Sequence, residues 1–280
     1  MARRPVPIAE PSAGGGRSEP PRSQLPPTPP VPAAPPPGAL PNAYRPPSPL
    51  ASAFPEVIKN VLILNGLVFL AQVIVEARAP DVIFSPIDLW FALWPIGAPE
   101  LVQFSDGVVR FGTFQPWQIV TTAFLHGGVM HLLFNMYSLF LFGSAVERTL
   151  GGRRFLSLYA AAVLGASLLQ LAITSAPYFT AAPDPPFPVP TVGASGGVMG
   201  VVAACAILFP RAEIYIIPLP FPIQMRWMAL GYVALDLFGG FGPRDTGIAH
   251  FAHLGGFAAG ALALQYWRGR LPVRPRARLT

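Results

Sequence analysis

The apolar residues of this chain fall into roughly six stretches between residues 57 and 267, each close to the length that a bilayer demands. Polar residues, glycines and prolines separate the stretches, and the fourth is short and rich in small residues. The pattern predicts an all-α, polytopic membrane protein built as a bundle of six transmembrane helices. The predicted spans are about Val57–Glu76, Trp117 or Leu132 to Val146, Phe155–Thr174, Ala194–Phe209, Ile223–Phe238 and Ile248–Trp267.

The chain before the first span has a different composition. Residues 1–55 are dense in Pro, Ser, Gly and Ala, and such a segment cannot bury a core. We therefore predict a disordered Pro-rich cytoplasmic tail at 1–55, a six-helix domain at 56–268 and a basic cytoplasmic tail at 269–280. For the first tail we favour a plain linker, and the alternative is a docking segment for a proline-binding partner.

The overall composition supports a membrane protein. Charged residues make up 11% of the chain, whereas soluble domains have about one quarter. The net charge of +6 does not indicate nucleic-acid binding, because the arginines lie in the tails and short loops, where positive charge orients membrane spans. The single cysteine, Cys205, excludes a disulfide within the chain and a thiolate metal cluster.

The charged residues also predict the topology. The two ends and the connections on one side are basic, and the opposite connections are mainly acidic. Both termini should therefore be cytoplasmic, and we expect a bacterial inner (plasma) membrane. The second, fourth and sixth spans then run from outside to inside. The basic set includes Arg45, Lys59, Arg153, Arg154, Arg211, Arg226, Arg268 and Arg270, and the acidic set includes Asp81, Asp88, Glu100, Asp106, Asp184 and Asp245.

The connection between the first two spans is long, from about Ala77 to Gln115, and contains the aromatic segment Asp88–Pro95. Two Trp and a Phe within one or two turns favour a helix that lies in the membrane interface. The alternative is a soluble loop that packs its own small core.

Four polar residues in the apolar stretches are candidates for chemistry. Ser195 follows a glycine at the start of the fourth span, where free helix N–H groups can hold a developing negative charge. His253 lies about one turn into the sixth span and suits a general base. His131 and Asn135, at the outer end of the second span, share one helix face because they are four residues apart. The topology places all of them in the same outer part of the membrane, where hydrolysis requires access to water.

Other readings of these residues remain open at this point. Small residues in apolar helices often serve helix packing, and Gly196, Gly200, Gly256 and Gly260 form such patterns. This reading is compatible with catalysis, since the fourth and sixth spans must approach closely for Ser195 to reach His253. The histidines at 126, 131, 250 and 253 could instead bind a metal or relay protons. No Asp or Glu is well placed to orient His253, because Asp236 and Asp245 lie elsewhere, so we favour a Ser–His dyad over a triad.

Several short motifs, in order, resemble the rhomboid family of intramembrane serine proteases. His126, His131 and Asn135 match its two-His-and-Asn pattern, and Gly193-Ala-Ser195-Gly196 matches GxSG. The resemblance covers about Val57 to Trp267. The remaining matches are GxxxExxxG at Gly143, Glu147 and Gly151, and AHxxG at Ala252, His253 and Gly256.

The resemblance implies a rhomboid-type six-helix bundle that cleaves single-span membrane proteins in the lipid bilayer, without a cofactor or metal. By resemblance Ser195 is the nucleophile, His253 the base, and His131 and Asn135 support the oxyanion. His126 and Gly193 are expected to support the site. Two departures from the family pattern stand out: Gln118 follows Trp117 where many members have Arg, and Met199 replaces a common aromatic residue. The alternative functions are a non-proteolytic rhomboid-like binder of membrane proteins and a His-based transporter.

Overall fold

The computed structural model describes residues 55–78, 80–105, 107–180, 186–215, 221–242 and 248–273, all within the unit Pro47–Thr280. The predicted N-terminal tail lies outside the described residues except for Pro55, and the predicted C-terminal tail is described only to residue 273.

The described residues contain six helices of 14 residues or more, and they coincide with the six predicted apolar stretches. The second begins at Val129, so the span does not start at Trp117; the short helices α4 (Gln118–Thr121) and η2 (Thr122–Phe124) precede it. The third extends beyond the prediction to Phe179. The six are α2 (Glu56–Glu76), α5 (Val129–Leu150), α6 (Gly152–Phe179), α7 (Ser195–Leu208), α8 (Met225–Phe241) and α9 (His250–Trp267).

The outer surfaces of these helices are apolar. Helices α2, α5 and α6 are long and apolar enough to cross a membrane, and α7 is a shorter apolar helix. Large side chains such as Leu67, Phe134 and Phe238 are exposed, with 60%, 64% and 81% of their surface accessible. Water would disfavour so much exposed apolar surface, whereas lipid does not. The protein is therefore a multi-pass integral membrane protein.

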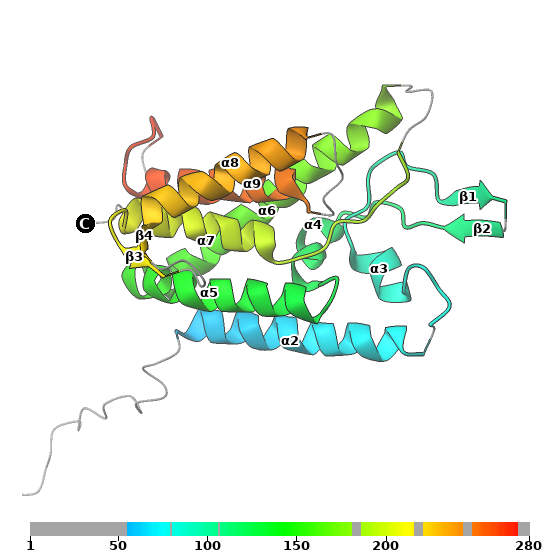
Figure 1. Ribbon diagram of the computed structural model, residues 1–280, viewed down its shortest axis with the longest axis horizontal. Coiled ribbons are helices and arrows are strands. Elements are labelled where there is room, and N and C mark those ends of the chain that lie inside the picture. Colours follow the sequence, from blue (N-terminus) through cyan, green and yellow to red (C-terminus); the bar gives the residue numbers. More distant parts are fainter. Residues whose placement is uncertain are drawn as a thin grey trace, which may run out of the picture. The chain divides into compact units, whose positions relative to one another are not determined.

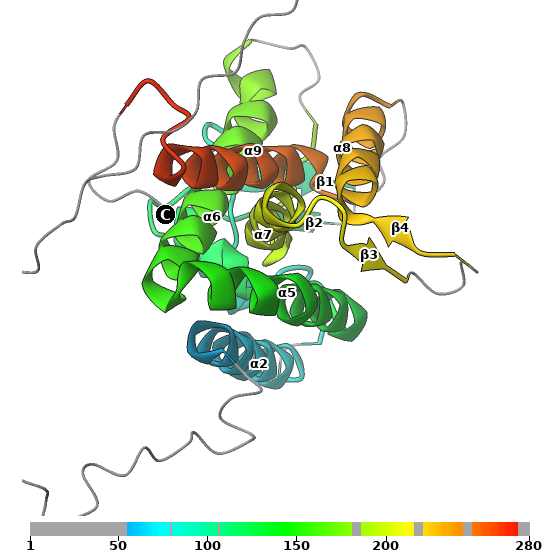
Figure 2. The same cartoon turned by 90° about the vertical axis from the view of Figure 1, so that its left-hand side faces the viewer.

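Helix α7 is the centre of the bundle. Figure 2 shows α7 close to end-on, with α5, α6, α8 and α9 around it and α2 outside α5. All ten residues from Gly196 to Cys205 are buried, although α7 is only 14 residues long. A short helix whose middle is fully buried needs neighbours on every side. These neighbours together fix the position of Ser195, the first residue of α7.

Glycines bring α7 and α9 into backbone contact. A Cβ added to Gly256 would lie 1.9 Å from the Gly196 carbonyl oxygen, and one added to Gly260 would lie 2.5 Å from Gly200 Cα. Side chains larger than hydrogen cannot fit between these helices. The close approach of the fourth and sixth spans that the sequence predicts is therefore confirmed. Helix α6 joins the same contact, because a Cβ on Gly200 would lie 2.2 Å from Ala162 Cβ.

The connection from α2 to α5 has a structure of its own (Figure 1), which comprises α3 (Pro86–Phe91) and an antiparallel hairpin of β1 (Leu101–Phe104) and β2 (Gly107–Arg110). Helix α3 starts with a capping box between Ser85 and Asp88. The prediction of one interfacial helix over 88–95 was wrong in its second half. The helix ends at Phe91, because the chain turns inward to bury Trp94 against Phe84 and Phe111.

A carboxylate from α5 fixes the start of α2. Glu147 is buried, and its two oxygens accept hydrogen bonds of 3.0 Å from the backbone N–H groups of Val57 and Ile58. These N–H groups have no intrahelical acceptor, so the carboxylate satisfies them and complements the helix dipole. The Glu of GxxxExxxG is therefore a helix cap. At the same end of the bundle, β3 (Glu213–Ile214) and β4 (Ile223–Gln224) pair between α7 and α8.

Candidate active site

A cavity of about 680 Å³ lies between α5, α6, α7, α8 and α9, with part of its wall formed by residues 189–192. Four of the residues singled out in the sequence line it: His131, Asn135, Ser195 and His253. Three helices far apart in sequence therefore bring their polar side chains to one space. Gly193 and His126 lie beside this cavity and not among its lining residues.

The segment before Ser195 is held by backbone hydrogen bonds to the α2–α5 connection. Thr191 and Leu93 exchange two hydrogen bonds of 2.9 and 3.0 Å, and the Gly193 N–H donates to the Thr122 carbonyl at 3.0 Å. Gly193 has φ 131°, which disfavours a side chain, and a Cβ there would lie 2.9 Å from the His131 ring. The first glycine of GxSG is therefore needed for the turn that delivers Ser195. Its N–H is already used and is not free for an oxyanion.

The N-terminus of α7 leaves free donors at Ser195. Its N-cap, Ala194, provides no side-chain hydrogen bond, and the first intrahelical bond runs from the Val198 N–H to the Ala194 carbonyl at 3.0 Å. The N–H groups of Ser195 and its next two neighbours therefore have no intrahelical acceptor. Such a helix start attracts negative charge, and Ser195 Oγ stands at it.

The His131 ring lies beside the turn that leads to Ser195. The Gly127 N–H donates to His131 Nδ1 at 3.3 Å, so Nδ1 is an acceptor and the proton is assigned to Nε2. Nε2 lies 2.9 Å from the position of a Cβ on Gly193, and Ser195 Oγ lies 3.5 Å from the same position. The His131 ring is therefore close to Ser195, with Nε2–H as its donor group.

Asn135 adds a second donor on the same face of α5. It is buried, and its Nδ2 donates one hydrogen bond of 3.0 Å to the His131 carbonyl one turn earlier. An amide nitrogen carries two hydrogens, so a second one is available to the cavity that Asn135 lines.

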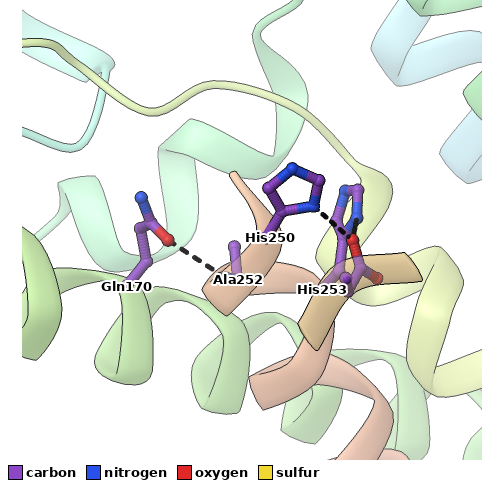
Figure 3. Close-up of polar contacts among 5 residues, drawn as sticks. Gln170, His250, Ala252 and His253 are labelled. Carbon is purple, nitrogen blue, oxygen red and sulfur yellow. Dashed lines mark hydrogen bonds and ion pairs between the residues drawn. The ribbon is translucent and has the colours of Figure 1, made fainter. Parts of the chain in front are cut away.

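His253 is held by two neighbouring helices (Figure 3). Gln170 of α6 accepts a hydrogen bond of 3.1 Å from the Ala252 N–H, one of the free donors at the start of α9. Asp236 of α8 lies with Oδ1 3.0 Å from His253 Nδ1 and 2.8 Å from His250 Nδ1. The prediction that no carboxylate is placed to orient His253 was therefore wrong. Ser195 and His253 line the same cavity, and no hydrogen bond joins their side chains among the described residues.

His126 contacts the ring of His131. It is almost fully buried, and Gln72 of α2 clamps its backbone by accepting from the His126 N–H at 3.0 Å and donating to its carbonyl at 3.4 Å. Its ring meets that of His131 edge-on, with 5.2 Å between centroids. Neither ring nitrogen has a hydrogen-bond partner among the described residues. The ring contact, rather than a hydrogen bond, connects His126 to the site.

Comparison with known proteins agrees with these motifs. The family model for the rhomboid domain matches residues 113–269, which is more than half of the chain. The chain belongs to the rhomboid family. This rhomboid is similar to RHOMBOID-like protein 12, mitochondrial, of Arabidopsis thaliana, with 30% identity over 62% of this chain and 53% of that protein.

Two bacterial relatives are named as proteases. This rhomboid is 30% identical to Rhomboid protease AarA of Providencia stuartii, over 58% of this chain and 60% of that protein. It is also 30% identical to Rhomboid protease GluP of Bacillus subtilis, over 53% of this chain and 26% of that protein. This rhomboid spans roughly half or less of most of the relatives it matches, so what the whole relatives do is carried over only as a proposal.

Gln118, one of the departures from the family pattern, makes four side-chain hydrogen bonds within the α2–α5 connection. Its side chain is fully buried, and its Oε1 accepts from the N–H groups of Trp94 at 3.2 Å and Gln115 at 3.1 Å. Its Nε2 donates to the carbonyls of Trp90 at 3.3 Å and Thr113 at 3.1 Å. A neutral amide with two donors and two acceptor sites satisfies the loop by itself. Met199, the other departure, is buried and lines the cavity together with His253.

The four histidine rings of this rhomboid form two edge-on pairs. The pairs His126–His131 and His250–His253 have ring centroids 5.2 and 6.5 Å apart. Within the described residues, no group of three or more His, Cys, Asp or Glu side chains is arranged to hold a metal ion.

Proposed function

We propose that this rhomboid is an intramembrane serine endopeptidase that cleaves transmembrane segments of membrane proteins with a Ser–His dyad. The observation that carries the proposal is the shared cavity: Ser195 at an uncapped helix start, His253 opposite, and His131 and Asn135 as donors beside it. These are the nucleophile, base and oxyanion donors of acyl transfer. The protease names of the bacterial relatives support the same class of reaction.

The chemistry follows from these groups. Ser195 Oγ attacks the scissile carbonyl carbon while His253 Nε2 accepts the hydroxyl proton. The carbonyl oxygen becomes an oxyanion, which the Ser195 N–H, His131 Nε2–H and Asn135 Nδ2–H stabilise by hydrogen bonds. His253 then returns the proton to the leaving amine as the C–N bond breaks, and the acyl group remains on Ser195. Water, deprotonated by His253, attacks this ester and releases the new carboxyl end.

The cavity also suits a particular form of substrate. Its volume of about 680 Å³ is that of a small-ligand site, and an intact helix with its side chains is about 10 Å or more across. A transmembrane helix hides its carbonyls in intrahelical hydrogen bonds, so it must unwind locally to be cut. We therefore propose single-span membrane proteins with helix-weakening and small residues near the cut as the substrate class.

The same proposal includes an orientation in the membrane. The distribution of arginines favours cytoplasmic termini, with the cavity in the outer half of a bacterial inner membrane. Alkaline phosphatase fused to the C-terminus should be inactive in cells, and a fluorescent protein there should be bright. An active phosphatase fusion would reverse the orientation of the site.

The test of the function compares the wild type with Ser195→Ala and His253→Ala. The wild type in proteoliposomes should cleave a tagged single-span substrate and react with a fluorophosphonate probe, and both variants should lose cleavage. The control is Leu133→Ala, an exposed position on α5, which should cleave normally. Wild-type cleavage by Ser195→Ala would overturn the serine mechanism. Loss of cleavage in EDTA or phenanthroline would favour a metal-dependent reaction, and substrate capture without any cleavage would favour a non-proteolytic binder.

A further inference from the structure

The ring of His253 contacts a buried carboxylate on α8. Asp236 is in the middle of an apolar helix, and only 7% of its side chain is exposed. A carboxylate in such a place is costly unless it is paired, and a charged residue inside a membrane bundle points to a function. Its Oδ1 is 3.0 Å from His253 Nδ1 and 2.8 Å from His250 Nδ1, and both histidines belong to α9.

We propose that Asp236 is a positioning residue that holds His253 in the tautomer and orientation required of the general base; this role rests on the proposed function of the site. A carboxylate only accepts hydrogen bonds, so Nδ1 of His253 must carry the proton. In a neutral imidazole the lone pair is then on Nε2, the nitrogen that must take the proton of Ser195. When His253 becomes positively charged during the reaction, the carboxylate stabilises the imidazolium. A Ser–His–Asp arrangement results, with the carboxylate supplied by a different helix from either partner.

Asp236 also contacts His250. This second contact allows an experiment to distinguish the positioning role from a purely structural link between α8 and α9. His250 shares the same oxygen, and its side chain is 11% exposed, yet it is not among the residues that line the cavity. If the cluster only joins α8 to α9, losing either histidine contact should have similar consequences. If Asp236 acts through His253, the loss of the carboxylate should reduce catalysis far more than the loss of the His250 ring.

The experiment measures steady-state cleavage in proteoliposomes together with the rate of fluorophosphonate labelling of Ser195. We expect Asp236→Asn to lower kcat and the labelling rate by roughly a hundredfold or more, with KM little changed. Asp236→Glu, which keeps the carboxylate, should recover part of both. His250→Gln should stay within a few-fold of wild type, and Glu100→Gln, a carboxylate-to-amide change in an exposed ion pair, should match wild type.

Each outcome decides the proposal. Wild-type labelling in Asp236→Asn would overturn the positioning role, while loss of labelling in Ser195→Ala would leave the proposed protease intact. Equal losses in Asp236→Asn and His250→Gln, in labelling and in melting temperature, would show a structural tie instead. If Asp236→Asn does not fold, nitrogen NMR of the wild type at neutral pH decides, with His253 assigned by comparison with His253→Gln. A proton on Nδ1 of His253 supports the proposal, and a proton on Nε2 overturns it.

Discussion

The cavity lies between two helices in backbone contact, which we call the glycine wall, and two helices that reach the site with side chains, which we call the side-chain wall. On one side α7 and α9 touch backbone to backbone, where Gly196 and Gly256 leave no space for a methyl group. On the other side α5 and α8 reach the site with side chains, such as Asn135 and Asp236, and present large apolar groups outward. The glycine wall sets the distance between Ser195 and His253. The side-chain wall supplies the donors and charge. The glycine wall should therefore be sensitive to the size of a substituted side chain, and the side-chain wall to its charge and hydrogen-bonding groups.

A single added methyl group should break the glycine wall. In Gly256→Ala the new Cβ would meet the Gly196 carbonyl oxygen, which is backbone and cannot rotate away, so α7 and α9 must separate. We expect the free energy of unfolding to fall by about 3 kcal/mol or more, which is the upper end of the cost of overpacking a core, and we expect activity to be lost. Thermal unfolding in detergent, followed by circular dichroism, measures it.

The matched control is the same substitution on α8. Gly231 is exposed, and nothing lies within 4 Å of the position of its Cβ, so Gly231→Ala should be neutral or stabilising by up to about 1 kcal/mol. Equal melting temperatures in the two variants would contradict the difference between the walls.

Removal of a donor from the side-chain wall should affect turnover and leave the fold intact. Asn135→Ala and His131→Ala should each lower kcat by about a hundredfold to a thousandfold, because an oxyanion donor acts in the transition state. Among the described residues, the side chain of Asn135 donates a hydrogen bond only within its own helix, so the melting temperature of Asn135→Ala should be close to that of the wild type. Turnover of a fluorogenic transmembrane peptide in proteoliposomes checks this. Wild-type turnover in both variants would leave the oxyanion to backbone N–H groups alone.

The smallest effect is expected where a side chain supports the glycine wall. Gln170→Leu removes the acceptor of the Ala252 N–H at the start of α9 and should destabilise by about 1–3 kcal/mol, since a buried donor is left unpaired. Thr174→Val on the same helix removes only a bond to the Gln170 carbonyl one turn earlier and should change stability by less than about 0.5 kcal/mol. A Gln170→Leu protein as stable as Thr174→Val would show that packing alone fixes the start of α9.

The helices could be predicted because long apolar stretches and their glycines are local signals, and the close packing of α7 on α9 followed from the spacing of Gly196, Gly200, Gly256 and Gly260. The hairpin of β1 and β2 was missed, although the sequence Asp106-Gly107, placed between two short segments with apolar and polar residues, is a turn signal. The contact of Asp236 with His253 was also missed. It depends on how α8 is rotated against α9, which sequence spacing does not give. A buried charge in an apolar helix was the available signal.

The hydrogen bonds between Thr191 and Leu93 join segments about a hundred residues apart, and the backbone contact of α7 needs α9, which follows α7 in the chain. The chain is made from its N-terminus, and domains assemble as their parts emerge. The position of Ser195 relative to His253 is therefore fixed only after α9 has been made and has packed against α7. A partly inserted chain that lacks α9 has Ser195 without His253, so under the proposed mechanism it could not cleave neighbouring membrane proteins while it is being made.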